Sequence, residues 1–256
     1  MAMTFEDISL EVDHGVARIT MRRPDKLNAL RDQTGDELQA AFDEVENNPD
    51  VRVVIFTGEG RAFGAGYDLS AIEPDVIPDL AKVLDVHFNP LTLKMRESRL
   101  PIISVINGPC AGASVGLALS GDIVIAGRSA YFYEPFVGLA LIPDAGNTMF
   151  LPQIVGRIRA AGAMLLGERI SAEEAQSWGM VWRVYEDDEL MAKADEMAQK
   201  LSNLSPKSIS LTKNLISQAS ERGLARQLNL ERDAQGEACT APEVKASVAK
   251  FFAAQQ

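Results

Sequence analysis

The chain has 256 residues, of which 46% are hydrophobic and 24% charged, so it can bury a large core and does not have a disordered composition. Its formal net charge of -11 argues against a nucleic-acid or anionic-membrane surface, although a few local cations can still hold a phosphorylated small ligand. Two cysteines, Cys110 and Cys239, predict no disulfide framework. Without a basic-plus-apolar leader or an apolar run of bilayer length, the sequence predicts a cytoplasmic protein.

In chain order, the first elements are a hairpin, a helix and a buried strand. Apolar residues recur with period two over residues 8–21, on both sides of Asp13-His14-Gly15, which predicts a β-hairpin. Residues 32–47 form an expected polar helix. The continuous apolar run of residues 51–56 predicts a strand that is buried on both faces.

The middle of the chain repeats this alternation of helices and strands. Residues 80–97 are expected to be helical with a break at Pro90, and strands are expected at 101–106 and 122–126 around a small-residue helix at 112–119. Such alternation predicts right-handed β-α-β crossovers. We therefore expect one α/β core over residues 1–200.

Helices dominate after residue 156. Ser171 is the expected N-cap of one helix, and residues 180–185 form one more strand. Further helices are expected at 187–201, 206–219, 222–235 and 241–254. Residues 201–256 are thus predicted to be a helical C-terminal region.

The histidines and loops exclude several common mechanisms. The only two histidines, His14 and His87, lack metal-ligand spacing to another His or Cys, and no Gly-x-Ser-x-Gly elbow is present. The glycine-rich stretch at residues 57–60 lacks the ending of a phosphate loop. We expect neither a metal site nor a catalytic triad, and no cofactor other than a substrate-borne group.

Two glycine-rich junctions follow successive predicted strands. The first is Arg-Ala-Phe-Gly-Ala-Gly-Tyr-Asp-Leu at residues 61–69, and the second is Asn-Gly-Pro-Cys-Ala-Gly-Ala-Ser at residues 107–114. Ligands of open α/β folds bind where chains leave the carboxyl ends of strands, and small residues let the backbone approach them closely. Either junction alone is more simply a tight turn. Together they can offer two backbone N–H groups to one oxygen, as in an oxyanion hole.

These segments resemble motifs of the crotonase (enoyl-CoA hydratase/isomerase) superfamily. Residues 63–69 are similar to Phe-x-Ala-Gly-x-Asp-Leu, and residues 107–114 to the family's Asn-Gly-x-x-x-Gly segment. The similarity continues at residues 121–126, 138–148 and 177–181, so it covers nearly the whole chain. It implies an α/β fold, a crotonase-like spiral of β-β-α units with a helical C-terminal trimerisation region, and an acyl-CoA thioester substrate.

The resemblance also implies the residues of the site. The amides of Tyr67 and Ala113 would hold the thioester oxygen, and Lys26 would lie near the phosphates of CoA. The other expected substrate contacts are Lys26, Leu27, Ala65, Gly66, Asp68, Leu69, Gly112, Phe136 and Leu139.

The chain departs from hydratases at the acid–base positions. Hydratases use two glutamates to activate and protonate water, and aligned without gaps these fall on Gly116 and Phe136. Asp144 remains, where several isomerases of the superfamily have an acid. A pocket of Phe136, Leu139 and Leu141 would raise its pKa by desolvation. Asp144 is also a plausible turn or helix-cap residue, since it follows a proline.

Glu134 is the reserve acid. It lies two residues before Phe136, so strand alternation would put both on one face, and a slip in pairing would bring it toward the site.

Within the superfamily the chain most resembles ring-1,2-epoxyphenylacetyl-CoA isomerases of phenylacetate breakdown. Asn147 stands where a glycine is usual, and we expect it to alter the shape of the acyl pocket.

The sequence thus predicts an acyl-CoA isomerase that shifts a double bond or isomerises a ring epoxide, with Asp144 as proton carrier. The rivals are an enoyl-CoA hydratase that uses Glu134 with Asp144, and a non-catalytic acyl-CoA-binding member of the family.

Apolar residues of the last two helices, such as Leu224, Leu228 and Phe252, favour a homotrimer or a hexamer of two stacked trimers over helices folded back on their own core.

Overall fold

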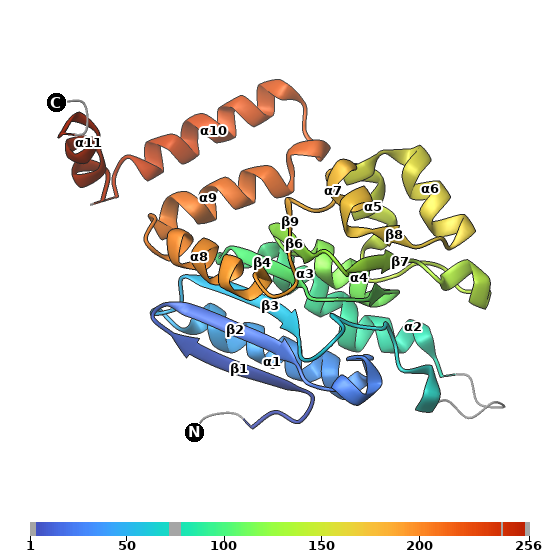
Figure 1. Cartoon of the computed structure of the whole chain (residues 1–256). Coiled ribbons are helices and arrows are strands. Elements are labelled where there is room, and N and C mark those ends of the chain that lie inside the picture. Colours follow the sequence, from blue (N-terminus) through green and yellow to red (C-terminus); the bar gives the residue numbers. More distant parts are fainter. Residues whose placement is uncertain (1–3, 72–77, 242, 254–256) are drawn as a thin grey trace.

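A computed structural model describes residues 4–71, 78–241 and 243–253 of the chain (Figure 1). A six-stranded sheet in the order β1-β2-β3-β4-β6-β9 forms its core. The first two strands are antiparallel and the others run parallel. The strands are β1 (Ile8–Asp13), β2 (Val16–Met21), β3 (Val53–Gly58), β4 (Ile102–Ile106), β6 (Ile123–Gly127) and β9 (Arg183–Tyr185).

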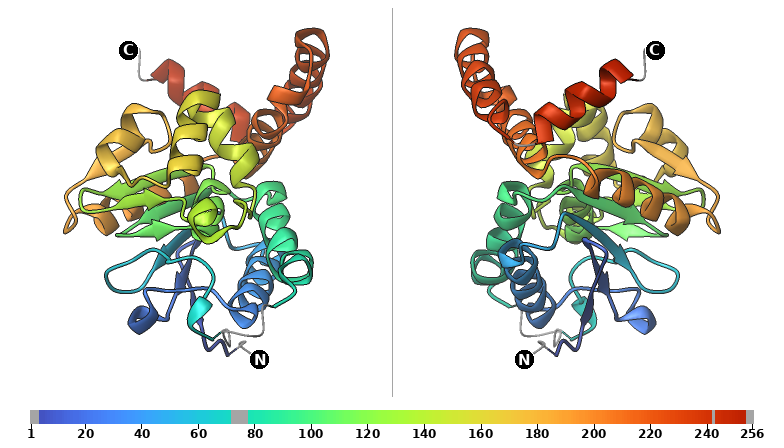
Figure 2. Two further views of the ribbon diagram at one scale, coloured as in Figure 1. Left: turned by 90° about the vertical axis from the view of Figure 1, so that its right-hand side faces the viewer. Right: turned by 90° about the vertical axis from the view of Figure 1, so that its left-hand side faces the viewer.

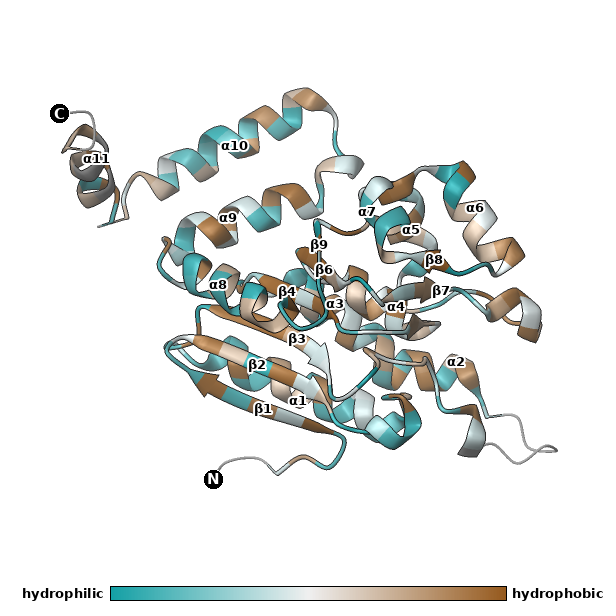
Figure 3. Cartoon of the chain, viewed as in Figure 1, coloured by the Kyte–Doolittle hydropathy of each residue, from teal (hydrophilic) through white to brown (hydrophobic). Residues whose placement is uncertain are grey.

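The central strands are buried on both faces because helices cover both sides of the sheet. On β3, Val54 and Phe56 pack into a large core with helices α1 (Asp32–Asn47) and α4 (Ala113–Leu119), whereas Val53 and Ile55 pack under α8 (Leu190–Ser202). This explains why the strand reads as an unbroken apolar run rather than an alternating one. Most of β3 is correspondingly hydrophobic in colour, whereas α10 (Leu224–Ala238) is largely hydrophilic along its middle (Figure 3).

The helices are α1 (Asp32–Asn47), α2 (Leu80–Val83), α3 (Asn89–Glu97), α4 (Ala113–Leu119), α5 (Asn147–Val155), α6 (Arg157–Leu166), α7 (Ala172–Ser177), α8 (Leu190–Ser202), α9 (Pro206–Ser217), α10 (Leu224–Ala238) and α11 (Glu243–Ala253). Short 3-10 turns lie at η1 (Pro24–Lys26), η2 (Leu69–Ala71), η4 (Phe136–Leu139) and η5 (Ala219–Glu221), and a π-turn at η3 (Leu84–Phe88).

Most of the expected elements are confirmed, with shifted ends. The hairpin pairs Ile8 with Met21, and α1 has the predicted bounds. The expected break in residues 80–97 is the π-turn, and Pro90 lies in the first turn of α3. Strand β3 begins two residues late because the Val51 amide bonds to Asn48 in the preceding turn.

A second, three-stranded sheet was not expected from the sequence. It consists of β5 (Cys110–Ala111), β7 (Tyr131–Tyr133) and β8 (Ile170–Ser171) in the order β5-β7-β8. These strands have only two or three residues, too few for a period to show. The strand-alternation argument for Glu134 and Phe136 was wrong, since β7 ends at Tyr133 and Phe136 begins η4.

The last helices lie apart from the α/β core. Helix α10 packs on α9 and buries none of its side chains (Figure 2). Leu224 and Phe252 are 74% and 61% exposed. The division into a core up to residue 200 and a helical region after it stays a prediction. No helix among the described residues has both the length and the apolar character needed to cross a bilayer.

Candidate active site

The two glycine-rich junctions meet in space. A Cβ added to Gly66 would lie 3.5 Å from the Cα of Gly112 and 3.1 Å from the carbonyl oxygen of Ala111. The Gly66 amide donates to the buried Ser114 hydroxyl at 3.1 Å, and the Ala111 amide donates to Gly64 at 2.8 Å. The sequence predicted two separate turns in one site, and the structure packs one directly on the other.

This contact brings Tyr67 and Ala113 to the wall of one cavity. Within the described part of the chain, neither amide donates a hydrogen bond. Ala113 is the first residue of α4, where an amide has no partner in the helix. Two free backbone donors on residues that line one cavity are the groups that an oxyanion hole requires.

The cavity is largely apolar and contains one ionisable carboxyl group. Asp144 lies on its wall together with Phe136, Leu139 and Leu141, as the sequence predicted. The remaining lining residues come from the two junctions, the turns beside them and the segment α2–η3. They are Ala65, Gly66, Tyr67, Leu69, Leu80, Val83, Leu84, Phe88, Gly112, Ala113 and Pro135.

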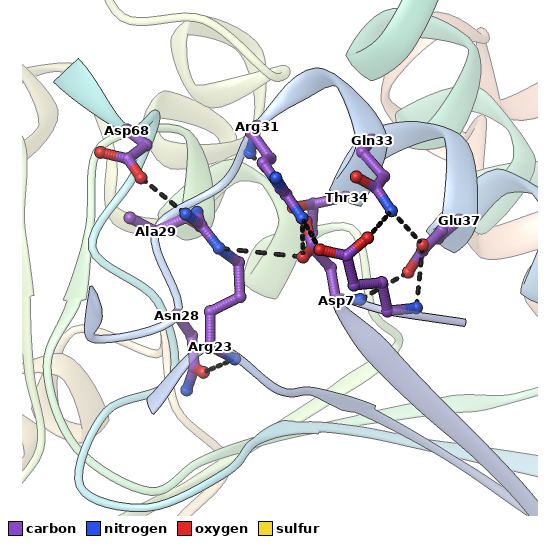
Figure 4. A network of polar contacts seen from close by, with 10 residues as sticks. Asp7, Arg23, Asn28, Ala29, Arg31, Gln33, Thr34, Glu37 and Asp68 are labelled. Carbon is purple, nitrogen blue, oxygen red and sulfur yellow. Dashed lines mark hydrogen bonds and ion pairs between the residues drawn. The ribbon is translucent and has the colours of Figure 1, made fainter. Parts of the chain in front are cut away.

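Asp68 differs from its expected role as a substrate contact. Its carboxylate is buried and accepts from the Arg23 guanidinium at 2.8 Å and from the Ser70 hydroxyl at 2.6 Å (Figure 4). The bonds from Ser70 and then from Arg23 hold the pKa of Asp68 below its usual range. Asp68 therefore fixes the loop that carries the Tyr67 amide and does not line the cavity.

Arg23 extends this support into a network that sequence reasoning missed. Its guanidinium also donates to the Ala29 carbonyl and lies 3.8 Å from the Asp7 carboxylate. Arg31 clamps the same Asp7 with two bonds of 2.7 and 2.8 Å (Figure 4). The network thus joins the start of the first strand, the segment around residues 23–31 and the loop at residues 61–69, which carries the Tyr67 amide. Nothing in the local sequence around Arg23 and Pro24 indicates that Arg23 supports this loop.

Lys26 and Leu27 lie beside this network but outside the cavity wall. Lys26 ends η1 and is exposed, and Leu27 is half-buried with a left-handed φ of +51°. Leu30 follows in the same segment and pairs with the loop at residues 61–69. Its amide donates to the Gly66 carbonyl at 2.8 Å, and its carbonyl accepts from the Asp68 amide at 2.7 Å. A ligand that contacts residues 26–30 would therefore lie close to the loop that carries the Tyr67 amide.

Asp144 has the electrostatics of a proton carrier. Burial raises its pKa to about 6, and its buried Oδ1 has no hydrogen-bond partner in the described part of the chain. The loop that presents it has left-handed backbone at Ala140, Ala145 and Gly146. At neutral pH such a carboxyl group is mostly ionised yet still basic enough to accept a proton.

Glu134 is not among the residues that line the cavity, but it lies close enough to Asp144 to be affected by its charge. It is 1% exposed, and both of its carboxyl oxygens are buried without a partner among the described residues. Burial first, and the Asp144 charge second, raise the pKa of Glu134 to about 8. The neighbouring Cys110 thiol also has a raised pKa, through burial and the Glu134 charge. The ranking of Glu134 after Asp144 stays a prediction, and the strand alternation that supported Glu134 is absent from the structure.

The two positions of the hydratase glutamates hold no proton carrier. Phe136 is buried and its ring lines the cavity. A Cβ at Gly116 would lie 2.3 Å from the carbonyl oxygen of Ala145. The loop that carries Asp144 therefore occupies the space that a side chain at position 116 would need.

Asn147 does not shape the acyl pocket, contrary to expectation. It is fully buried behind the cavity wall, and its side-chain amide donates to the Gly112 carbonyl at 3.3 Å. Its own backbone amide donates to the Asp144 carbonyl at 2.9 Å.

As for metals, the described residues contain no cluster of three or more His, Cys, Asp or Glu side chains that could hold an ion.

Comparison with known proteins decides the family. Residues 11–256 match the enoyl-CoA hydratase/isomerase family model. The chain belongs to the enoyl-CoA hydratase/isomerase family. It is 39% identical over 251 residues to the 1,2-epoxyphenylacetyl-CoA isomerase of Escherichia coli K12, covering 97% of this chain and 96% of that protein.

Relatives with hydratase names are also similar. The short-chain-enoyl-CoA hydratase of Clostridium acetobutylicum is 32% identical over 252 residues, covering 98% of this chain and 96% of that protein. The crystal structure of enoyl-CoA hydratase from Bacillus anthracis superposes with a TM-score of 0.90 at 29% identity and covers 96% of both chains. The crotonase-like fold predicted from the sequence is thereby confirmed. The family includes both isomerases and hydratases, so the site has to distinguish between them.

Proposed function

We propose that this member of the family is an acyl-CoA isomerase that shifts a double bond or isomerises a ring epoxide. The observation that carries the proposal is the cavity wall, where Asp144 is the one ionisable carboxyl group among the described residues. Of the two positions that match the hydratase glutamates, Phe136 lines this wall and Gly116 is packed against the Ala145 carbonyl. One carboxyl can move a proton between two carbons. Positioning and splitting water in the hydratase manner requires two.

The thioester oxygen binds the amides of Tyr67 and Ala113 in this proposal. As the α-carbon loses its proton, the electron pair of the C–H bond delocalises onto that oxygen and forms an enolate. One oxyanion donor typically lowers such a barrier by about 3 kcal/mol. The apolar lining strengthens this effect because it excludes water from the developing charge.

Asp144 carries the proton in the same sequence. Its carboxylate removes the α-proton of a β,γ-unsaturated ester, and the resulting carboxylic acid returns the proton to the γ-carbon. The enolate electrons then re-form the carbonyl and the α,β double bond, so no water or redox partner is consumed. With a ring epoxide, the enolate electrons form a double bond to the adjacent ring carbon as its C–O bond breaks, and the Asp144 carboxylic acid returns the proton to the released oxygen. The raised pKa of Asp144 suits it to both halves of this cycle near neutral pH.

A panel of acyl-CoA esters read by mass spectrometry tests the proposal. In deuterated water, a 3-enoyl ester should isomerise and gain deuterium without the gain of about 20 mass units that addition of D2O would give, whereas crotonyl-CoA should hydrate poorly. Fast hydration of crotonyl-CoA would overturn the proposal. Tight binding of esters without any deuterium exchange would instead identify a non-catalytic acyl-CoA-binding member.

An enoyl-CoA hydratase is the second candidate, and Glu134 is the observation that favours it. Its buried, unpartnered carboxyl adjacent to Asp144 supplies a second acid, although it does not line the cavity. In that case Glu134→Gln would abolish crotonyl-CoA hydration. Under the isomerase proposal, the same variant retains most of its double-bond-shifting activity.

The placement of CoA and the assembly are part of the same proposal. Lys26 is exposed beside the loop at residues 61–69 and would meet the CoA phosphates, with Leu27 next to it.

Exposed apolar side chains on α10, including Leu224 and Leu228, support a homotrimer or a hexamer. Light scattering coupled to size exclusion at micromolar concentration should give a mass well above 27.8 kDa, and a monomer would overturn the assembly.

A further inference from the structure

Asn147 touches both halves of the proposed site. It is the first residue of α5 and is fully buried. Its side-chain amide donates to the carbonyl of Gly112, in the oxyanion junction, at 3.3 Å. Its main-chain amide donates to the carbonyl of Asp144, the proton carrier, at 2.9 Å. One residue thus links the two loops whose relative position the chemistry needs.

The contact with Gly112 acts on the oxyanion donor itself. The Gly112 carbonyl and the Ala113 N–H belong to one peptide group, which is planar. A hydrogen bond that fixes the carbonyl therefore also fixes the direction of the N–H on the opposite side. A donor on the carbonyl additionally polarises the group and strengthens the hydrogen bond that its N–H donates by about 10–30%.

The backbone at this point needs such a restraint. Gly112 has φ +56° and ψ -132°, a conformation that glycine adopts freely and other residues avoid. Its own amide is held by the Tyr133 carbonyl at 2.9 Å, which fixes the preceding peptide group. The following peptide group, which carries the Ala113 N–H, is held on its carbonyl side by two donors, the Val115 amide at 2.9 Å and the Asn147 side chain at 3.3 Å.

Packing alone does not account for an asparagine here. The Oδ1 atom of Asn147 is buried and has no hydrogen-bond partner in the described part of the chain. A buried unsatisfied acceptor costs stability, so a small apolar residue would fill the space at lower cost. The donor on Nδ2 is the property that a small apolar residue would lack.

We propose that Asn147 is a positioning residue that orients and polarises the peptide group whose N–H, at Ala113, binds the thioester oxygen. This inference rests on the proposed function, since it assumes that an acyl-CoA thioester occupies the cavity. It assigns Asn147 no contact with the substrate.

The test is Asn147→Ala in the full chain. Infrared difference spectra of bound phenylacetyl-CoA, labelled with carbon-13 at the carbonyl, measure the polarisation of the thioester directly. We expect a smaller downshift of the carbonyl band than in the unmodified protein. With a 3-enoyl ester, kcat should fall about tenfold, less than the roughly 10²–10³ for loss of a whole oxyanion donor, while KM changes less than about twofold.

Ser120→Ala is the matched control. The buried Ser120 hydroxyl also donates to a carbonyl of α4, that of Gly116 at 2.8 Å, but at the end of the helix away from Ala113. This variant should leave the carbonyl band and kcat unchanged. If Asn147→Ala folds poorly, Asn147→Gly removes the same donor, and the same spectrum decides.

The outcomes separate this inference from the proposed function. A downshifted band that is equally large in the unmodified protein and in Asn147→Ala overturns the role of Asn147 and leaves the isomerase proposal intact. A bound ester whose band stays at its position in buffer, in the unmodified protein itself, overturns the oxyanion assignment and thus the proposed function. Asp144→Asn should keep the downshift and lose turnover.

Discussion

The loop with Asp68 and the loop with Asp144 hold the same residue type in opposite electrostatic settings. Asp68 is buried against Arg23 and Ser70, and its pKa is lowered. Asp144 lies on an apolar wall with an unpartnered buried oxygen, and its pKa is raised to about 6. Both flank the same cavity, on the loops that form its two sides.

The difference shows how partners decide the role of a carboxylate. An ion-paired carboxylate holds its charge over a wide pH range and stabilises the backbone around it. A desolvated carboxylate without a partner destabilises the fold when charged, but it exchanges protons near neutral pH. We therefore expect substitutions at Asp68 to act mainly on stability and substitutions at Asp144 mainly on turnover.

The largest expected effect is that of Asp144→Asn. This near-isosteric change removes the proton carrier, so kcat for a 3-enoyl ester should fall by roughly 10²-fold or more. Ester affinity and the midpoint of thermal unfolding should stay unchanged or rise, because a buried charge is lost. If the variant retained more than half of its activity, Asp144 would not be the proton carrier.

Asp68→Asn should show the reverse pattern. It leaves the Arg23 guanidinium, whose side chain is 18% exposed, without its closest carboxylate. We expect the free energy of unfolding in urea to fall by about 2 kcal/mol, less than the roughly 3–5 kcal/mol of a fully buried pair because Asp7 stays near Arg23. Glu59→Gln, which breaks the exposed pair with Arg22, should cost less than about 0.5 kcal/mol. Equal losses for the two variants would contradict the comparison.

A third prediction concerns the pH dependence of stability. The pKa of Glu134 is raised to about 8 in the fold from 4.5, so the folded chain retains a proton that the unfolded chain releases. Stability from this group is complete below pH 4.5 and declines up to about pH 8, by at most about 1.4 kcal/mol per pH unit. Glu134→Gln should flatten that decline in urea titrations at several pH values. Asp68 contributes oppositely, since its lowered pKa gives stability that is lost in acid.

The smallest expected effect is on the alkaline side of the activity profile. The acid limb of kcat/KM should lie near pH 6, where Asp144 becomes ionised. Above about pH 8, ionisation of Glu134 places a second buried negative charge near the forming enolate and should lower kcat/KM several-fold. Glu134→Gln should keep the acid limb and lose the alkaline one. An unchanged alkaline limb would show that Glu134 does not influence the site.

The sequence predicted the elements with strong local signals. The hairpin and α1 were predicted with their ends, because Asp13-His14-Gly15 marks the turn and the helix has a clear amphipathic period. Strands β7 and β8 were missed, since they are held by pairing with distant residues rather than by their own pattern. The cavity-lining position of Asp144 was predicted from the family pattern, and its raised pKa from its apolar neighbours.

The supporting residues of the site could not be predicted. The contact of Asn147 with Gly112 joins residues that are 35 positions apart, and that of Arg23 with Asp68 joins residues 45 positions apart. Neither pair belongs to a local motif. Glu134 was misplaced because Pro135 takes a helical conformation, which ends the alternation that a longer strand would have continued.

The close packing of Gly116 against Ala145 limits how such a site can evolve. A side chain at position 116 would collide with a main-chain oxygen, which cannot rotate away as a flexible side chain can. Restoring a glutamate there, even together with Phe136→Glu, would therefore yield a strained protein and not a water-adding enzyme. The loop would have to change first, so the mutational path between the two chemistries requires a remodelled backbone before any new acid can be useful. Laboratory selection for hydration should accordingly enrich insertions or deletions around residues 140–146 ahead of substitutions at 116.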